Sequence, residues 1–275
     1  LKGGHCWLRA MLSQWSGEER LHANALTPVL ISGKQGLSKS TFCRLLMPDS
    51  LRHYFIDNLN LTAGSSPEKK LVKNGLINLD EFDKIKESQQ ATLKNLLQMV
   101  NVPVFRGKRL GWVNESRLAS FIATTNVYQV LIDSTGSRRF LCVEVLKPIS
   151  EEPLKHKQIY AQLKEELKSG APDYLNKEEE KALQKHNKAY YRQSLLEDVF
   201  HCCFRHPLEA EKGIWLTTAE IFQVMRKFNS AALKEVSARQ LGLKLSAMGY
   251  MAKHTSFGNR YYVFNLSAEK KEVSL

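Results

Sequence analysis

The chain has 275 residues, 43% of them hydrophobic, which is enough for one large or two modest globular domains. Lys and Arg total 40 against 28 Asp and Glu, and the resulting formal net charge of +12 favours a polyanionic partner. Every apolar run is shorter than the roughly 18 residues that a membrane-spanning helix needs, so an integral membrane protein is not expected.

The cysteines number five, and this sparse, odd set excludes a disulfide-stapled scaffold and favours the reducing cytoplasm. The sequence opens at Leu1 without a charged-then-apolar leader, so we expect a piece of a longer chain. Its patterns predict three segments: an α/β domain over residues 1–150, a helical connector over 151–213 and a winged-helix domain over 214–275.

A phosphate-binding loop is predicted between an apolar strand over residues 27–32 and a helix over residues 40–47. In such a loop, backbone N–H groups surround a phosphate, a lysine reaches the terminal oxygens and a hydroxyl binds Mg²⁺. Lys39 and Ser40 fit the last two roles. The alternative to a phosphate-binding loop is an ordinary glycine-containing turn between a strand and a helix. The predicted nucleotide-binding residues are Gly33, Lys34, Gln35, Gly36, Leu37, Ser38, Lys39, Ser40 and Thr41.

One position departs from the phosphate-loop pattern G-x-x-x-x-G-K-[ST]. Ser38 stands where that pattern has the glycine before the lysine. Its Cβ and hydroxyl are expected to crowd either the phosphate or the backbone angles, which would weaken nucleotide binding.

Two later strands end in residues suited to catalysis. The strand over residues 75–79 leads into Asp80, expected in the Mg²⁺ shell, and Glu81, expected to polarise the attacking water. Asp83 is expected to cap a helix and is the next candidate for the water. The strand over residues 118–125 leads into Asn126, expected to contact the terminal phosphate and the water; a simple turn-forming Asn is the alternative.

These motifs, GKQGLSKST, LINLDEFD and FIATTN, are followed by GSRRF over residues 136–140. In this order and spacing they resemble the virulence-associated E family of P-loop ATPases, which is similar to superfamily 3 helicases and to the ATPase part of viral and mobile-element primase-helicases. The resemblance covers roughly residues 20–150. It implies an additional-strand, AAA+-like core with ATP and Mg²⁺ as cofactors, assembly into a hexameric ring, movement on nucleic acid and a primase-like domain upstream.

The resemblance also implies that Arg138 or Arg139 reaches the nucleotide of a neighbouring subunit. If the alternation of the strand over residues 140–145 extends back to them, the two side chains point in opposite directions. Two surface arginines that only favour solubility are the alternative.

A basic hairpin is predicted between the acidic motif and Asn126. Its β-type flanks surround Arg106, Lys108 and Arg109, which are candidates for phosphate contacts, while a neighbouring aromatic ring could stack on a base. Superfamily 3 helicases place a DNA-contacting hairpin between the same two motifs. The alternative is an exposed tip that only aids solubility.

The predicted winged helix has two helices, each opened by a capping box, followed by a β-hairpin. Arg239, Gln240 and Lys244 would lie on the outward face of the second helix and meet DNA, flanked from the wing by Lys253 and Arg260. A protein-binding role is the alternative, because many winged helices contact proteins.

Together these patterns predict a nucleic-acid-dependent ATPase, a ring-forming DNA helicase motor of a phage or mobile element. One alternative is a P-loop protein without translocation, such as a regulatory ATPase or a phosphotransferase. Another is a DNA-binding module with a vestigial nucleotide site, which Ser38 motivates.

Overall fold

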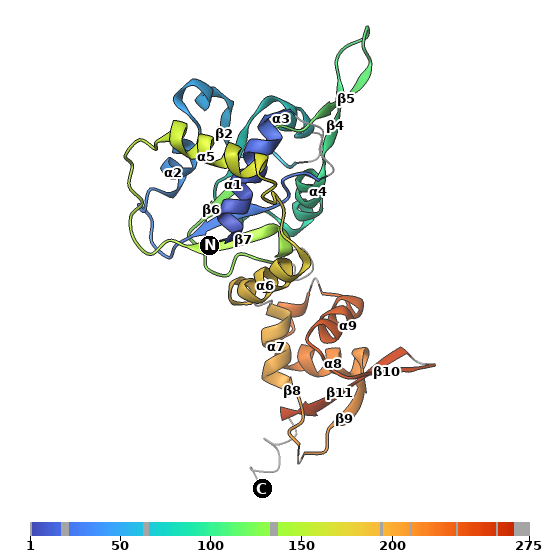
Figure 1. Ribbon diagram of the computed structural model, residues 1–275. Helices are drawn as coiled ribbons and strands as arrows, with labels where there is room; N and C mark the ends of the chain where they lie inside the picture. The colour runs from blue at the N-terminus through green and yellow to red at the C-terminus, as the bar shows by residue number, and fades with distance from the viewer. Residues whose placement is uncertain are drawn as a thin grey trace. The chain divides into compact units, whose positions relative to one another are not determined.

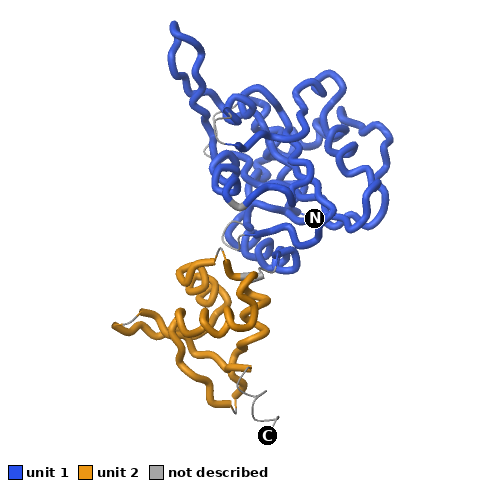
Figure 2. Tube along the Cα trace, turned by 180° about the vertical axis from the view of Figure 1, so that it is seen from behind, with its two compact units in different colours: residues 1–192 blue, residues 193–275 orange. Residues whose placement is uncertain are grey.

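The computed structural model describes residues 2–17, 22–62, 66–132, 137–192, 195–209, 211–234, 236–256 and 258–266. Contacts between residues divide the chain into unit 1, Leu1–Arg192, and unit 2, Gln193–Leu275 (Figure 2). The predicted three-segment division, with boundaries at 150 and 213, stays a prediction. Within the described residues, no helix is long and apolar enough to cross a membrane.

Unit 1 is built on a five-stranded parallel sheet with the strand order β2-β3-β6-β1-β7 (Figure 1). Its strands are β1 (Thr27–Ile31), β2 (Phe55–Asp57), β3 (Leu76–Leu79), β6 (Ser120–Thr125) and β7 (Phe140–Glu144). Every residue of β1, β3 and β6 is buried, as expected for strands whose two faces are both covered by helices.

Helices cover both faces of this sheet. On one face Val29 and Ile31 of β1 share a core with Leu93 of α4, and on the other Leu30 shares a core with Trp7 of α1. This alternation follows from the two-residue period of a strand. The helices of unit 1 are α1 (Lys2–Trp15), α2 (Lys39–Leu45), η1 (Asp49–Tyr54), α3 (Glu68–Lys73), η2 (Phe82–Lys84), α4 (Glu87–Gln98), η3 (Ser137–Arg139), α5 (His156–Lys168), α6 (Lys177–Asn187) and η4 (Lys188–Tyr190).

The predicted basic hairpin is present and projects away from the sheet (Figure 1). It consists of β4 (Asn101–Phe105) and β5 (Trp112–Ser116), paired antiparallel with Phe105 opposite Trp112. At its base, just after β5 ends, Arg117 is buried and donates to the carbonyls of Leu96 and Leu97 near the carboxyl end of α4.

Unit 2 packs its helices against a small antiparallel sheet in which β11 pairs with β8, β9 and β10. Both predicted capping boxes form, one between Thr217 and Glu220 and one between Ser237 and Gln240. The elements are α7 (Leu195–Cys203), β8 (Phe204–Arg205), β9 (Ile214–Thr217), α8 (Thr218–Phe228), η5 (Ala231–Leu233), α9 (Ala238–Ala247), β10 (Ala252–Thr255) and β11 (Gly258–Asn265).

Candidate functional site

A cleft of about 540 Å³ opens at the carboxyl ends of β1, β3 and β6. The carboxyl ends of parallel strands share one edge of a sheet, so the three motifs that follow these strands converge there. The lining residues are Gln35, Gly36, Leu37, Ser38, Lys39, Ser40, Thr41, Asp80, Glu81, Asp83, Lys84, Thr124, Thr125, Asn126 and Val127.

Gly33 and Lys34 belong to the predicted loop but are not among these lining residues. At Gly33 an added Cβ would lie 2.8 Å from Cε2 of Tyr128, so a larger residue there would require the Tyr128 ring to move. The Tyr128 hydroxyl donates to Glu144 Oε1 at 2.9 Å and thereby fixes the ring over the start of the loop.

Lys39 is the cation of the cleft that the sequence predicts, and it is only 8% exposed. Its amine donates to Asn126 Oδ1 at 2.8 Å and to the hydroxyl of Ser32. Burial lowers the pKa of Lys39 below that of an ordinary lysine, and the nearby Asp80 carboxylate opposes this effect. The phosphate-loop lysine and the amide that follows β6 therefore meet within one polar cluster.

The two residues predicted to hold Mg²⁺ also meet. Ser40 Oγ donates to Asp80 Oδ1 at 3.2 Å, and the hydroxyl of Thr124 donates to the same oxygen. One carboxylate beside a hydroxyl is a donor set that suits Mg²⁺, which commonly takes one or two carboxylates, waters and substrate phosphates. These residues therefore fit the metal that the P-loop pattern implies.

Glu81 is held in an unusual backbone conformation at the end of β3. Its φ of 51° lies in the left-handed region, which is uncommon for a residue other than glycine. Its carboxylate is exposed and pairs with Lys84 Nζ at 2.7 Å. A non-glycine residue in this conformation is a feature that clusters at functional sites.

The prediction that Asp83 caps a helix is wrong. Asp83 lies inside the short helix η2, whose N-cap position is occupied by Glu81 without a side-chain cap. Its Oδ1 instead accepts from the Thr125 hydroxyl at 2.6 Å and ties the acidic motif to β6. Ser65 and Glu68 have the spacing of a capping box, but Ser65 lies outside the described residues, and the N-cap of α3 is Pro67.

Ser38 shows why the phosphate-loop pattern has glycine at its position. Its φ of 57° and ψ of 28° are left-handed, a conformation that costs a residue with a Cβ roughly 1–2 kcal/mol. Its hydroxyl donates to Glu151 Oε1 at 2.6 Å. Glu151 lies 113 positions away, and nothing in the sequence marked it as a partner of the loop.

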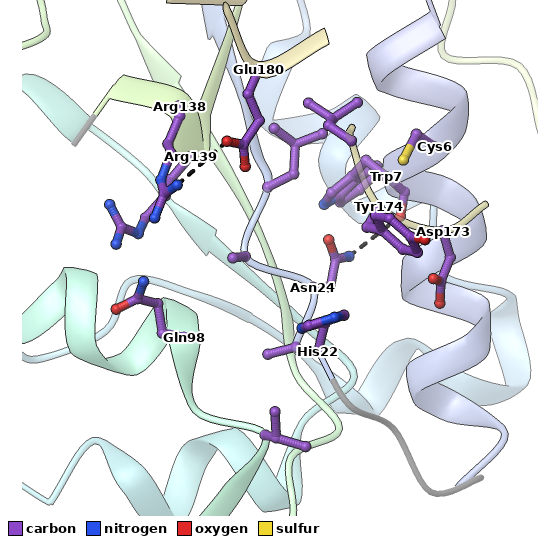
Figure 3. Close-up of a pocket in the computed structure, with 15 residues that line it drawn as sticks. Cys6, Trp7, His22, Asn24, Gln98, Arg138, Arg139, Asp173, Tyr174 and Glu180 are labelled. Atoms are coloured by element: carbon purple, nitrogen blue, oxygen red, sulfur yellow. Dashed lines mark hydrogen bonds and ion pairs between the residues drawn. The ribbon is translucent and has the colours of Figure 1, made fainter. Parts of the chain in front are cut away.

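Arg138 and Arg139 lie in η3 and line a second cleft of about 480 Å³ in unit 1 (Figure 3). Strand alternation does not reach them, because β7 begins only at Phe140. Arg138 pairs with Glu180 at 3.4 Å, and its side chain is 45% exposed. Among the described residues, the two clefts share no lining side chain. Gly136, the first residue of that motif, lies outside the described part of the chain.

Asn187 of α6 is a positioning residue for η3 that sequence reasoning missed. Its side chain is fully buried, and its Nδ2 donates to the carbonyls of Ser137 at 2.8 Å and Phe140 at 2.7 Å. It therefore holds the backbone on both sides of the two arginines.

The hairpin presents two of its three predicted cations freely. Lys108 and Arg109 are exposed at the tip, whereas Arg106 forms a two-pronged ion pair with Glu115. Phe105 is 45% and Trp112 73% exposed, and their ring centroids lie 5.7 Å apart. The pairing of Phe105 with Trp112 follows from the register of β4 and β5, and it was not predicted from the sequence.

In unit 2, the five predicted contact residues differ in their surroundings. Arg239 and Lys253 are exposed, and Lys253 lies opposite Arg260 on the paired strands β10 and β11. Gln240 Oε1 accepts from the Ser237 backbone in the capping box, and Lys244 Nζ pairs with Glu197 at 2.6 Å. Leu241 and Leu245 of α9 are buried, and Lys244 is only partly exposed, so the outward-facing DNA contact surface stays a prediction.

Sheet order, phosphate loop and cleft together define a P-loop domain of the α/β class. The family model for the virulence-associated protein E-like domain matches residues 24–192, and the chain belongs to this family. A second model, described as a domain of unknown function from a B. theta gene description, matches residues 193–263. The predicted family is thereby confirmed.

Among solved structures, the chain is similar to one described as "The apo structure of NrS-1 C terminal region (305-718)", with 13% identity and a TM-score of 0.45 over 96% of this chain and 70% of that one. A second, "The A form apo structure of NrS-1 C terminal region-CTR(305-718)", has 14% identity and a TM-score of 0.43 over 95% and 70%. A search of curated proteins found no match.

Proposed function

We propose that this chain is a nucleic-acid-dependent ATPase, the motor part of a DNA helicase from a phage or mobile element. The observation that carries the proposal is the convergence in one cleft of Lys39 with Asn126 and of Ser40 with Asp80. Four residues from three motifs thereby supply the groups that bind a nucleoside triphosphate and its metal: a cation, a hydroxyl, a carboxylate and an amide. The position of β6 between β1 and β3 supports an additional-strand, AAA+-like core.

ATP would lie with its phosphates against residues 33–41. The Lys39 amine would exchange its contact with Asn126 for the terminal phosphate oxygens, and Ser40 and Asp80 would hold Mg²⁺. When bound, the metal would neutralise charge on the phosphates. Asn126 would orient the water beside the terminal phosphate.

Glu81 would accept a proton from the attacking water. Its present ion pair with Lys84 joins two exposed groups, and such pairs contribute little, so the carboxylate can turn into the cleft at small cost. Asp83 is engaged by Thr125 and is therefore the poorer candidate for this role.

Ring assembly would bring η3 of one subunit to the nucleotide of the next. The exposed Arg138 suits this role better than Arg139, which is partly buried, and Asn187 would fix the turn that presents it. Such an arginine stabilises charge on the transferring phosphoryl group. A hexamer is the ring size that the family resemblance implies, together with a primase-like domain upstream.

DNA would be contacted by the hairpin tip and by unit 2. Lys108 and Arg109 offer charge for phosphates, and Phe105 with Trp112 offers ring faces for bases. In unit 2, the order of one helix, two short strands, two helices and two paired strands supports a winged helix. Arg239 and Lys253 are its least engaged candidates, while Lys244 would first have to leave Glu197.

ATP hydrolysis with and without single-stranded DNA tests this function. We expect hydrolysis by the parent chain to rise on addition of DNA and to vanish in Lys39→Ala. Ring formation with ATP separates a translocating motor from a regulatory ATPase or phosphotransferase, which needs no inter-subunit arginine. DNA binding without any hydrolysis would instead favour a binding module with a vestigial nucleotide site.

A further inference from the structure

Residues 149–160, in the segment that follows β7, form two hydrogen bonds with the end of the phosphate loop, just before α2 begins. The backbone N–H of Ile149 donates to the carbonyl of Leu37 at 3.2 Å. Two positions further on, Glu151 Oε1 accepts from the hydroxyl of Ser38 at 2.6 Å. Both contacts are made to the residues immediately before Lys39.

The same segment holds the far end of α2. His156 Nε2 bonds to the carbonyl of Leu45 and the Tyr160 hydroxyl donates to the carbonyl of Leu46, both at 2.7 Å. Both carbonyls lie at the carboxyl end of α2, where the last C=O groups have no partner within the helix. Residues 149–160 therefore form hydrogen bonds on both sides of α2, with the end of the phosphate loop before it and with its carboxyl end.

Ser38 is the residue of the phosphate loop whose backbone conformation most needs a stabilising contact. Glycine adopts a left-handed conformation without a steric penalty, whereas serine needs a compensating interaction. A hydrogen bond to a carboxylate is among the stronger ones available to a hydroxyl. It also turns the Ser38 hydroxyl toward Glu151, which does not itself line the cleft among the described residues.

We propose that Glu151 is a positioning residue for the phosphate loop. By holding Ser38 in the left-handed conformation, it keeps the backbone between Gly36 and Lys39 arranged for a nucleotide phosphate. The Ser38–Glu151 pair thus supplies what glycine supplies alone in the usual pattern. This proposal rests on the proposed function, because it assigns the loop to a nucleotide.

A double-mutant cycle tests the pair in the full chain, with ADP and Mg²⁺ as the probe and affinity measured by calorimetry. Glu151→Ala should weaken ADP binding about tenfold when Ser38 is present, a change typical of losing a hydrogen bond to a charged group. In the Ser38→Gly chain, which should bind at least as tightly as the parent, the same substitution should change affinity by less than about twofold. Glu151→Gln should recover part of the loss, because its amide oxygen still accepts.

The matched control is Glu152→Ala, which removes a neighbouring exposed carboxylate with no side-chain bond to the loop among the described contacts. It should leave ADP affinity unchanged. Equal losses from Glu151→Ala in both backgrounds would overturn the proposal, as would tighter binding, which would mean that Glu151 only repels phosphate.

Hydrogen exchange without nucleotide separates this proposal from the proposed function. Amides of residues 36–39 should exchange faster in Glu151→Ala than in the parent or in Glu152→Ala. If the parent binds no ADP, the proposed function fails while the exchange rates still report whether Glu151 holds the loop. Unchanged exchange would refute the positioning role.

Discussion

Lys39 Nζ and Asn126 Oδ1 lie 2.8 Å apart although 87 positions separate them in the sequence. The contact exists because β1 and β6 are neighbours in the parallel sheet, with Ile31 paired to Thr125 immediately before the two loops begin. The sheet order therefore determines which side chains share the cleft.

Replacement of Lys39 by alanine should abolish nucleotide binding, because it removes the buried amine that would contact the phosphates. Binding of ADP and of ATP by calorimetry measures this. Lys34→Ala is the matched control, because it lies in the same loop but its side chain is exposed and does not line the cleft. The substitution leaves the loop backbone in place and should not change binding. Unchanged affinity in Lys39→Ala would mean that the nucleotide site lies elsewhere.

Replacement of Glu81 by glutamine should preserve ATP affinity and reduce hydrolysis by about 100-fold or more, the contribution expected of a general base. The amide keeps the shape of the side chain and loses its basicity. Phosphate release and ATP affinity measured on the same protein separate the two effects. If Glu81→Gln hydrolyses ATP at the parent rate, the role belongs to another group, with Asp83 the next to test.

Arg138→Ala and Arg139→Ala are expected to differ. The one that reaches the neighbouring nucleotide should bind ATP normally and lose roughly 10³–10⁵ in hydrolysis rate. Mixing that variant with Lys39→Ala should restore part of the activity, because mixed rings contain some intact sites. Full activity in both single variants would mean that neither arginine contributes to the active site of a neighbouring subunit.

The hairpin should contribute charge and stacking separately. Lys108→Ala and Arg109→Ala should each weaken single-stranded DNA binding and reduce its salt dependence by about one released ion. Trp112→Ala should cost about 1–3 kcal/mol of binding with an unchanged salt slope, as expected for a stacking ring. The double variant Arg106→Ala with Glu115→Ala is the control, because it removes an ion pair and leaves the net charge of the hairpin unchanged. Equal salt slopes in all four variants would argue against phosphate contacts at the tip.

Arg117→Ala should lower the free energy of unfolding by about 3 kcal/mol, because it leaves buried carbonyls without a donor. Its guanidinium also lies over the Phe121 ring, 5.1 Å from the centroid. Urea denaturation monitored by circular dichroism measures the loss. A change below about 1 kcal/mol would mean that water replaces the guanidinium at these carbonyls.

Much of the fold could be predicted because its information is local. Apolar runs marked β1, β3 and β6 as strands, and capping boxes located α8 and α9. The convergence of Lys39, Asp80 and Asn126 followed from the polar residues that end parallel strands. The contacts of Ser38 with Glu151 and of Asn187 with η3 could not be predicted, since they join segments whose placement depends on tertiary packing.

One local expectation failed, and the condition attached to another is not met, for a related reason. Asp83 had the sequence context of a cap, yet the backbone places Glu81 at that position and turns Asp83 toward Thr125. Arg138 and Arg139 precede a strand, but a short helix intervenes before β7. Such boundaries shift by a residue or two under tertiary contacts, and each shift redirects a side chain.

The central claim is that the cleft around Lys39 and Asp80 hydrolyses ATP in response to nucleic acid. The most direct measurement is the steady-state rate of phosphate release from ATP and Mg²⁺ by the full chain, with and without single-stranded DNA. The account predicts a rate that rises several-fold with DNA and falls to background in Lys39→Ala under both conditions. A parent chain that binds DNA but releases no phosphate in either condition would contradict it.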